Sequence, residues 1–206
     1  MTLYCATSNP GKLAEFRMAV ERFGGGALRV ERLPGLAEIP PCAEAGLTFA
    51  ENAAQKAVYY SRYAPGLLFA DDSGLEVDAL GGAPGVLSAR FAGEGATDEA
   101  NNRLLLARLA GVEDRAARFV CVITLAEGGR LVETFRGVVE GRILHEPRGA
   151  NGFGYDPLFF YPPFGCSFGE VGRERKLEAS HRGAALAKMC AYLNRRGAEN
   201  AEKAPD

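Results

Sequence analysis

Two adjacent carboxylates, Asp71 and Asp72, directly follow the apolar run 67–70 and precede Ser73 and Gly74. The apolar run predicts a buried strand, and the glycine would let the backbone turn, so that both acids emerge at the strand's carboxyl end. Ligands bind at that end in open α/β sheets. Because adjacent acids repel each other, we expect a cation, hydrogen-bond donors or a shared proton beside them, most simply a divalent metal. An isolated Asp-Asp pair also fits a turn in which one acid caps the backbone and the other is solvated. Other residues of the chain must therefore distinguish a metal site from such a turn.

A polar turn near the start of the chain is a candidate anion site. It joins a β-rich run, residues 2–8, to an amphipathic helix over residues 13–23. Hydroxyls, an amide, free backbone N–H groups and an ammonium at a helix N-terminus suit an anion, although plain helix capping explains Asn9 and Pro10 as well. The spacing is not that of a Walker A loop. The members of this turn are Thr7, Ser8, Asn9, Pro10, Gly11 and Lys12.

Three later groups complete a possible nucleotide site. Glu44, Asp71 and Asp72 supply acids for a metal. The glycine-rich loop 148–157 carries two aromatic residues, which favours a ligand-binding loop over a simple linker. An aromatic ring there would stack on a base, unless it only anchors its loop to the core. Later cations would donate to the base edge, unless they are simply solvated. The residues concerned are Phe153, Gly154, Tyr155, Asp156, Lys176, His181 and Arg182.

Composition narrows the class of protein. Apolar residues make up 47% and charged residues 24% of the 206-residue chain, which is ordinary for a soluble globular protein, and no apolar run could span a bilayer. The first seven residues read as a strand and not as a secretory signal, so we expect a cytoplasmic protein without a membrane partner. A net charge of −2 gives no reason to expect binding to nucleic acid.

The numbers and spacing of cysteine and histidine residues restrict which metal ion the protein could bind. The five cysteines contain no CxxC pair, which favours reduced thiols, and two histidines cannot build an all-histidine site. Oxygen ligands therefore point to Mg²⁺, with Mn²⁺ as a possible substitute.

Helices and strands alternate along most of the chain. We predict strands over residues 2–8, 28–33, 67–70 and 158–161, helices over 13–23, 48–63, 97–111 and 184–195, and an antiparallel β-hairpin over 119–125 and 131–135. This pattern predicts an α/β fold with a mixed, mostly central twisted sheet, flanking helices and a hairpin extension. Residues 1–197 are expected to form a single domain and residues 198–206 a flexible C-terminal tail.

Six motifs follow one another from the first strand to the last helix: Thr7–Lys12, Gly46–Ala53, Ala70–Leu75, Gly81–Gly85, Gly152–Pro157 and Ser180–Gly183. Together they resemble the inosine/xanthosine triphosphate pyrophosphatases. The resemblance implies the anticodon-binding or Maf-like ITPase fold. It also implies a magnesium-dependent, homodimeric hydrolase that removes ITP, dITP and XTP from the nucleotide pool, releasing the monophosphate and pyrophosphate.

The same resemblance implies a role for each matching residue. Residues 7–12 would grip the triphosphate, Asp72 would be the catalytic residue and bind metal with Glu44, and Ser73 would contact substrate. The base and sugar pocket would be formed by residues 153–156, Lys176, His181 and Arg182. Two residues depart from the family pattern: Ser8 replaces a common glycine, and Arg175 replaces a common acid.

A mechanism follows as a hypothesis. Water would attack the α-phosphorus in line, activated either by Asp72 or as a hydroxide on the metal. Lys176 or Arg182 would donate to the O6 acceptor of hypoxanthine or xanthine, whereas adenine presents an amino donor there. How guanine is excluded stays open. Two other functions also stay open: a pyrophosphatase for modified pyrimidine triphosphates, and a catalytically silent nucleotide sensor.

Overall fold

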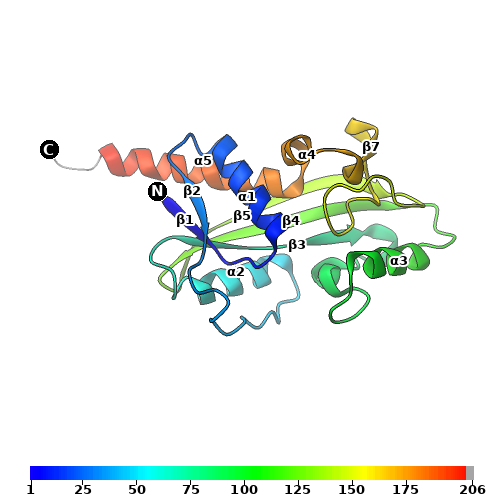
Figure 1. Ribbon diagram of the computed structural model, residues 1–206, viewed down its shortest axis with the longest axis horizontal. Helices are drawn as coiled ribbons and strands as arrows, with labels where there is room; N and C mark the ends of the chain where they lie inside the picture. Colours follow the sequence, from blue (N-terminus) through cyan, green and yellow to red (C-terminus); the bar gives the residue numbers. More distant parts are fainter. Residues whose placement is uncertain (203–206) are drawn as a thin grey trace.

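A seven-stranded mixed sheet runs through the protein and carries helices on both faces (Figure 1). The computed structural model describes residues 1–202, with side chains described through residue 198. The strands lie in the order β2-β1-β3-β4-β5-β6-β7, with β1 parallel to both β2 and β3 and all later pairs antiparallel. Their bounds are β1 (Thr2–Cys5), β2 (Arg29–Arg32), β3 (Leu68–Val77), β4 (Ala116–Glu127), β5 (Arg130–Ile143), β6 (Phe159–Tyr161) and β7 (Cys166–Ser167). The predicted mixed α/β class and the antiparallel hairpin are confirmed.

The main helices form two layers. Figure 1 shows α1 (Pro10–Phe23), α4 (Arg173–Ala179) and α5 (His181–Glu202) on one side of the sheet, with α2 (Phe49–Tyr60) and α3 (Asp98–Arg108) on the other. The largest core cluster packs α1 and α5 against β1, β3 and β4. Within the described part of the chain, no helix has both the length and the apolar character that a membrane crossing needs.

Local sequence explains where the helices start. The side chains of Asn9, Thr48 and Thr97 each accept a hydrogen bond from a backbone N–H in the first turn of the helix that follows, and Thr48 forms a full capping box with Glu51. These caps confirm the predicted starts of α2 and α3. Helix α1 begins at Pro10, three residues before the predicted range 13–23, directly after its N-cap Asn9.

The strand that carries the paired acids differs from its prediction. β3 does not end at residue 70 but continues to Val77, because the whole of it pairs with β4. Gly74 does not turn the chain. It allows a close approach instead, since a Cβ there would lie 2.3 Å from the Oγ of Ser88.

The pairing of β3 decides where its acids point. β1 pairs with β3 only at Leu68 and Phe69, so the β3 edge beyond them is not covered by β1. Successive side chains of a strand face opposite sides of the sheet. Asp71 accordingly contacts α1, and Asp72 contacts α2. The predicted crowding of two carboxylates at one strand end is therefore wrong.

The end of the chain also differs from its prediction. The last helix begins at His181, three residues before the predicted start, and continues to Glu202. Residues 198–202 of the predicted tail are therefore helical, and residues 203–206 lie outside the described residues. The short helix α4 was not predicted.

Gly137 of β5 sets how closely α5 approaches the sheet. A Cβ at this position would lie 2.0 Å from the carbonyl oxygen of His181 and 2.6 Å from the backbone nitrogen of Ala185. We expect Gly137→Ala to lower the free energy of unfolding by about 2 kcal/mol, because the first turn of α5 must move outward. Urea denaturation measures this change. Gly66→Ala is the control, since no atom lies near its Cβ position, and an equal loss in both variants would contradict the packing argument.

Candidate active site

A cleft of about 630 Å³ opens where β1 ends and β3 continues, and it is lined from both faces of the sheet. Lys12 and Asp72 open onto this one cleft. Two predicted residues, Pro10 and Gly11, do not line it; they form the first turn of α1, and Gly11 packs against the Phe153 ring. The predicted residues that do line it are Thr7, Ser8, Asn9, Lys12, Glu44, Asp72, Ser73, Phe153, Gly154, Tyr155, Asp156, Lys176, His181 and Arg182.

Buried ion pairs form one wall of the cleft. Lys176 Nζ donates to Asp156 Oδ2 at 2.6 Å and to Glu15 Oε1 at 3.1 Å. The other oxygen of Glu15 accepts from Arg182 Nη1. All four side chains are almost inaccessible to solvent, so each depends on its partners for compensation of its charge.

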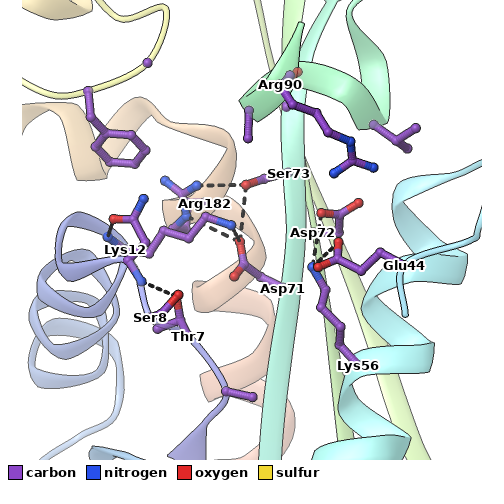
Figure 2. Close-up of a pocket in the computed structure, with 18 of the residues that line it drawn as sticks. Thr7, Ser8, Lys12, Glu44, Lys56, Asp71, Asp72, Ser73, Arg90 and Arg182 are labelled. Carbon is purple, nitrogen blue, oxygen red and sulfur yellow. Dashed lines mark hydrogen bonds and ion pairs between the residues drawn. The ribbon is translucent and has the colours of Figure 1, made fainter. Parts of the chain in front are cut away.

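The same network continues to the polar turn of residues 7–12. Arg182 Nη2 donates to Ser73 Oγ at 2.9 Å, and Ser73 Oγ donates to Asp71 Oδ2 at 3.2 Å. Asp71 then accepts from Lys12 Nζ at 2.8 Å (Figure 2). Three carboxylates thus alternate with three cations along the network, which is neutral as a whole. In order, the groups are Asp156, Lys176, Glu15, Arg182, Asp71 and Lys12.

The Asp71 carboxyl is held ionised by this network. Burial by itself would raise its pKa, but the charges of Lys12, Arg182 and Lys56 outweigh burial and lower the pKa to about 2. Asp71 is therefore a counter-ion for Lys12 and Arg182. It faces the other side of the sheet from Asp72, so the structure separates it from Asp72, with which it was expected to serve as an acid for a metal.

A second charged cluster lies on the α2 side. Lys56 Nζ lies 3.2 Å from Asp72 Oδ1 and 3.1 Å from Glu44 Oε2 (Figure 2). Asn52 Nδ2 donates to Asp72 Oδ2 at 3.2 Å. Two carboxylates share one lysine, so the cluster carries one excess negative charge. Burial raises the pKa of Asp72, against the opposing effects of Lys56, Lys12 and the hydrogen bond from Asn52.

This excess charge suits a divalent ion. No group of three His, Cys, Asp or Glu side chains in residues 1–202 is arranged as a complete metal site. Mg²⁺, however, is commonly held by one or two carboxylates and completed by water and the phosphates of a substrate. Glu44 and Asp72 fit that incomplete type of site.

The two aromatic rings of loop 148–157, Tyr155 and Phe153, have different environments. Tyr155 is buried and donates from its hydroxyl to the carbonyl oxygen of Ser88 at 2.9 Å, so it anchors the loop and does not offer a stacking surface. Phe153 is half-buried, with Lys176 Nζ 4.9 Å and the Arg182 guanidinium carbon 5.5 Å from its ring centre. Phe153 is therefore the ring available to a planar ligand.

His181 is a neutral group at the base of the cleft. Burial lowers its pKa well below the usual value, and the nearby charges of Arg182, Lys176 and Lys12 lower it further. Its ring stacks on Phe119, with the ring centres 4.8 Å apart. Its Nδ1 is buried and has no hydrogen-bond partner among the described residues.

Comparison with known proteins places this architecture in a family. The family model described as the Ham1 family matches residues 3–192. The chain belongs to the Ham1 family. A dITP/XTP pyrophosphatase from Acidobacterium capsulatum is 52% identical over 202 residues, covering 94% of this chain and 98% of that protein.

Solved structures of Ham1 proteins share the fold. The Ham1 protein of Staphylococcus aureus is 37% identical with a TM-score of 0.84, covering 95% of this chain and 100% of that one. A HAM1 protein from Coxiella burnetii is 36% identical with the same TM-score, covering 95% of this chain and 99% of that one. The Ham1 fold therefore extends over almost the whole chain.

Four polar residues of this Ham1 site were missed from the sequence. Glu15 lies three residues after Lys12 on α1, and Lys56 lies four residues after Asn52 on α2, so each pair shares a helical face. A polar pair on the same helical face as buried alanines could have indicated that these side chains point into the protein and not into solvent. The fourth, Arg90, ends the 3₁₀ helix Gly85–Arg90, and Figure 2 shows its guanidinium extending toward the space above Asp72. No sequence pattern indicated it.

Asp71→Asn tests the charge balance of the network. The variant leaves Lys12 and Arg182 without a shared anion, and we expect a loss of about 3 kcal/mol in the free energy of unfolding at pH 7. Because the folded pKa of about 2 is below the usual 3.8, the wild type keeps this stabilisation above about pH 4 and loses it as the pH falls toward 2. The difference between the two proteins should therefore shrink over that range.

Denaturant titrations at pH 7, 4 and 2 measure this difference. Asp78→Asn is the matched control, because its ion pair with Arg118 is partly exposed and should contribute at most about 1 kcal/mol. A pH-independent difference between wild type and Asp71→Asn would refute the assignment of Asp71 as the ionised counter-ion.

Proposed function

We propose that this protein hydrolyses the nonstandard purine nucleoside triphosphates dITP, ITP and XTP to the monophosphate and pyrophosphate, which removes them from the nucleotide pool. The observation that carries the proposal is a single cleft that joins an anion-binding turn at Lys12, the carboxylate Asp72 and the ring of Phe153. The relative from A. capsulatum named dITP/XTP pyrophosphatase supports the same activity.

Cations and N–H groups at one end of the cleft suit the triphosphate. The N-terminus of α1 presents backbone donors beside the hydroxyls of Thr7 and Ser8. Lys12 reaches the cleft from the same turn, and Lys56 and Arg90 line it from the other side of β3. Phosphate oxygens between these groups would meet positive charge from both faces of the sheet.

Buried donors at the other end suit a 6-oxopurine. A base stacked on Phe153 would lie beside Lys176 and Arg182, both of which are cations without acceptor capacity. The O6 oxygen of hypoxanthine or xanthine can accept from them, whereas the 6-amino group of adenine would leave a buried cation facing a donor. Glu15 holds both cations in place, which fixes the polarity of the pocket.

Magnesium is the proposed cofactor, with manganese as a possible substitute. Glu44 and Asp72 would hold the ion, and the excess negative charge of their cluster supports this assignment. When bound, the ion supplies electrostatic stabilisation of charge on the phosphoryl oxygens and on the leaving pyrophosphate. Lys56, which bridges the same two carboxylates, supplies a further positive charge at that position.

Asp72 is the proposed base. Asn52 and Lys56 each hold one of its oxygens, so the carboxylate is oriented before substrate binds. In the proposed step a water oxygen bonds to the α-phosphorus, the bond from that phosphorus to the bridging oxygen breaks, and pyrophosphate leaves. The proton of the water passes to the Asp72 carboxylate.

We also propose, from the family resemblance, that the enzyme is a homodimer in the cytoplasm. Exposed large apolar side chains, among them Tyr63, Leu87 and Leu131, provide surface that a second copy could bury.

A substrate panel tests the proposed activity. With Mg²⁺ present, we expect pyrophosphate release from dITP, ITP and XTP at rates at least about tenfold above those for dUTP and dTTP, because only the purines offer O6 to the buried cations. A coupled pyrophosphate assay on the purified protein measures these rates. Preference for a pyrimidine substrate would favour the alternative pyrophosphatase, and tight binding without turnover would favour the nucleotide sensor.

The Asp72→Asn variant tests the proposed base. Asparagine keeps the shape and the hydrogen bond from Lys56 but accepts no proton, so we expect kcat for dITP to fall at least about 100-fold. Binding of IMP, measured by calorimetry, should change little because the base pocket is intact. Chelation of divalent ions by EDTA should abolish wild-type turnover, and added Mg²⁺ or Mn²⁺ should restore it. Unchanged turnover in Asp72→Asn would remove this residue from the mechanism.

A further inference from the structure

The loop that carries Phe153 is fastened to α3 by two side chains one helical turn apart. Asp98 Oδ2 accepts a hydrogen bond from the backbone nitrogen of Gly154 at 2.6 Å. Asn102 Nδ2 donates to the carbonyl oxygen of the same glycine at 3.0 Å. Residues four apart on a helix share a face, so this spacing presents an acceptor and a donor together.

These two contacts fix a residue that would otherwise be free to move. Gly154 has a φ of 63°, and glycine passes easily between this left-handed conformation and the others open to it. Its nitrogen belongs to the peptide unit shared with Phe153, and its carbonyl belongs to the unit shared with Tyr155. Asp98 and Asn102 therefore hold the peptide units on both sides of Gly154.

The direction of the Phe153 ring depends on this restraint. The backbone nitrogen of Phe153 is held by Asp156 Oδ2 at 2.9 Å, and the peptide that follows Phe153 is held by Asp98. With both adjacent peptide units held, the Cα–Cβ bond of Phe153 keeps one direction. That direction sets the ring beside Lys176 and Arg182, the two cations of the base end of the cleft.

We propose that Asp98 and Asn102 are positioning residues for the purine base. They act through Gly154 and keep the Phe153 ring in the place where a base stacks. Because the loop is already ordered, nucleotide binding does not have to offset the entropy lost in ordering it. Asn102 is buried and does not line the cleft, so its effect on the base is indirect, whereas Asp98 holds Gly154 and also lines the cleft. The inference rests on the proposed function, because it takes Phe153 as the surface that meets the base.

Two variants test the proposal through ligands that separate the base from the phosphates. Asp98→Ala removes the acceptor for the Gly154 nitrogen, and Asn102→Leu removes the donor to its carbonyl while keeping a similar shape. Each should weaken IMP binding and raise the KM for dITP about tenfold, with a smaller effect on kcat. Binding of inorganic tripolyphosphate should stay within about twofold of wild type, because that ligand carries no base.

Matched variants separate this role from a general loss of stability. Glu99→Ala removes the neighbouring acid of the first turn of α3 but keeps both hydrogen bonds to Gly154, so it should leave IMP binding unchanged. Asp98→Asn keeps an oxygen that can accept from Gly154 and should restore most of the affinity lost in Asp98→Ala. Thermal unfolding identifies any variant that does not fold. If Asn102→Leu does not fold, the comparison of Asp98→Ala with Asp98→Asn tests the positioning role.

The possible outcomes distinguish this inference from the proposed function. Wild-type IMP affinity and dITP KM in Asp98→Ala would overturn the positioning role, and so would an equal loss of IMP and tripolyphosphate binding. Either result leaves the proposed activity intact as long as the wild type releases pyrophosphate from dITP. Failure of the wild type to cleave dITP would instead overturn the proposed function.

Discussion

The site depends on the unequal pairing of the two edges of β3. One edge pairs with β4 along the whole strand, while the other pairs with β1 at only two positions. Beyond those positions the strand stays extended, yet β1 no longer covers its edge, and alternate side chains are presented to opposite faces of the sheet. Asp71 and Asp72 can then be neighbours in the chain and still serve different tasks. This is why a single cleft is lined by helices from both layers.

Charge compensation divides this cleft into two regions of different character. On the α1 and α5 side, anions and cations alternate from Asp156 to Lys12 and cancel, so their positions are set by one another and not by a ligand. On the α2 side, Glu44 and Asp72 share only Lys56. A neutral, rigid region suits recognition of an uncharged base, and a region with excess negative charge suits a metal that accompanies phosphates.

Much of the fold was predictable because its signals are local. Capping residues such as Thr48 and Thr97 lie next to the helices they begin, and the hairpin of β4 and β5 is marked by β-rich runs around two glycines. Most of the candidate site was also predicted, since motifs such as residues 153–156 combine unusual residue types. The prediction for β3 failed because its length is set by pairing with β4, about fifty residues later in the chain.

The sequence by itself determined which chemical groups are present: acids, a polar turn at a helix start, an aromatic loop and late cations. Only the tertiary structure decided their partners. It paired Asp71 with Lys12, gave Lys176 and Arg182 a common anion in Glu15, and fastened Gly154 to α3. The physical reason is that hydrogen bonds and ion pairs act over a few ångströms in space, between residues that can be more than a hundred positions apart in the chain.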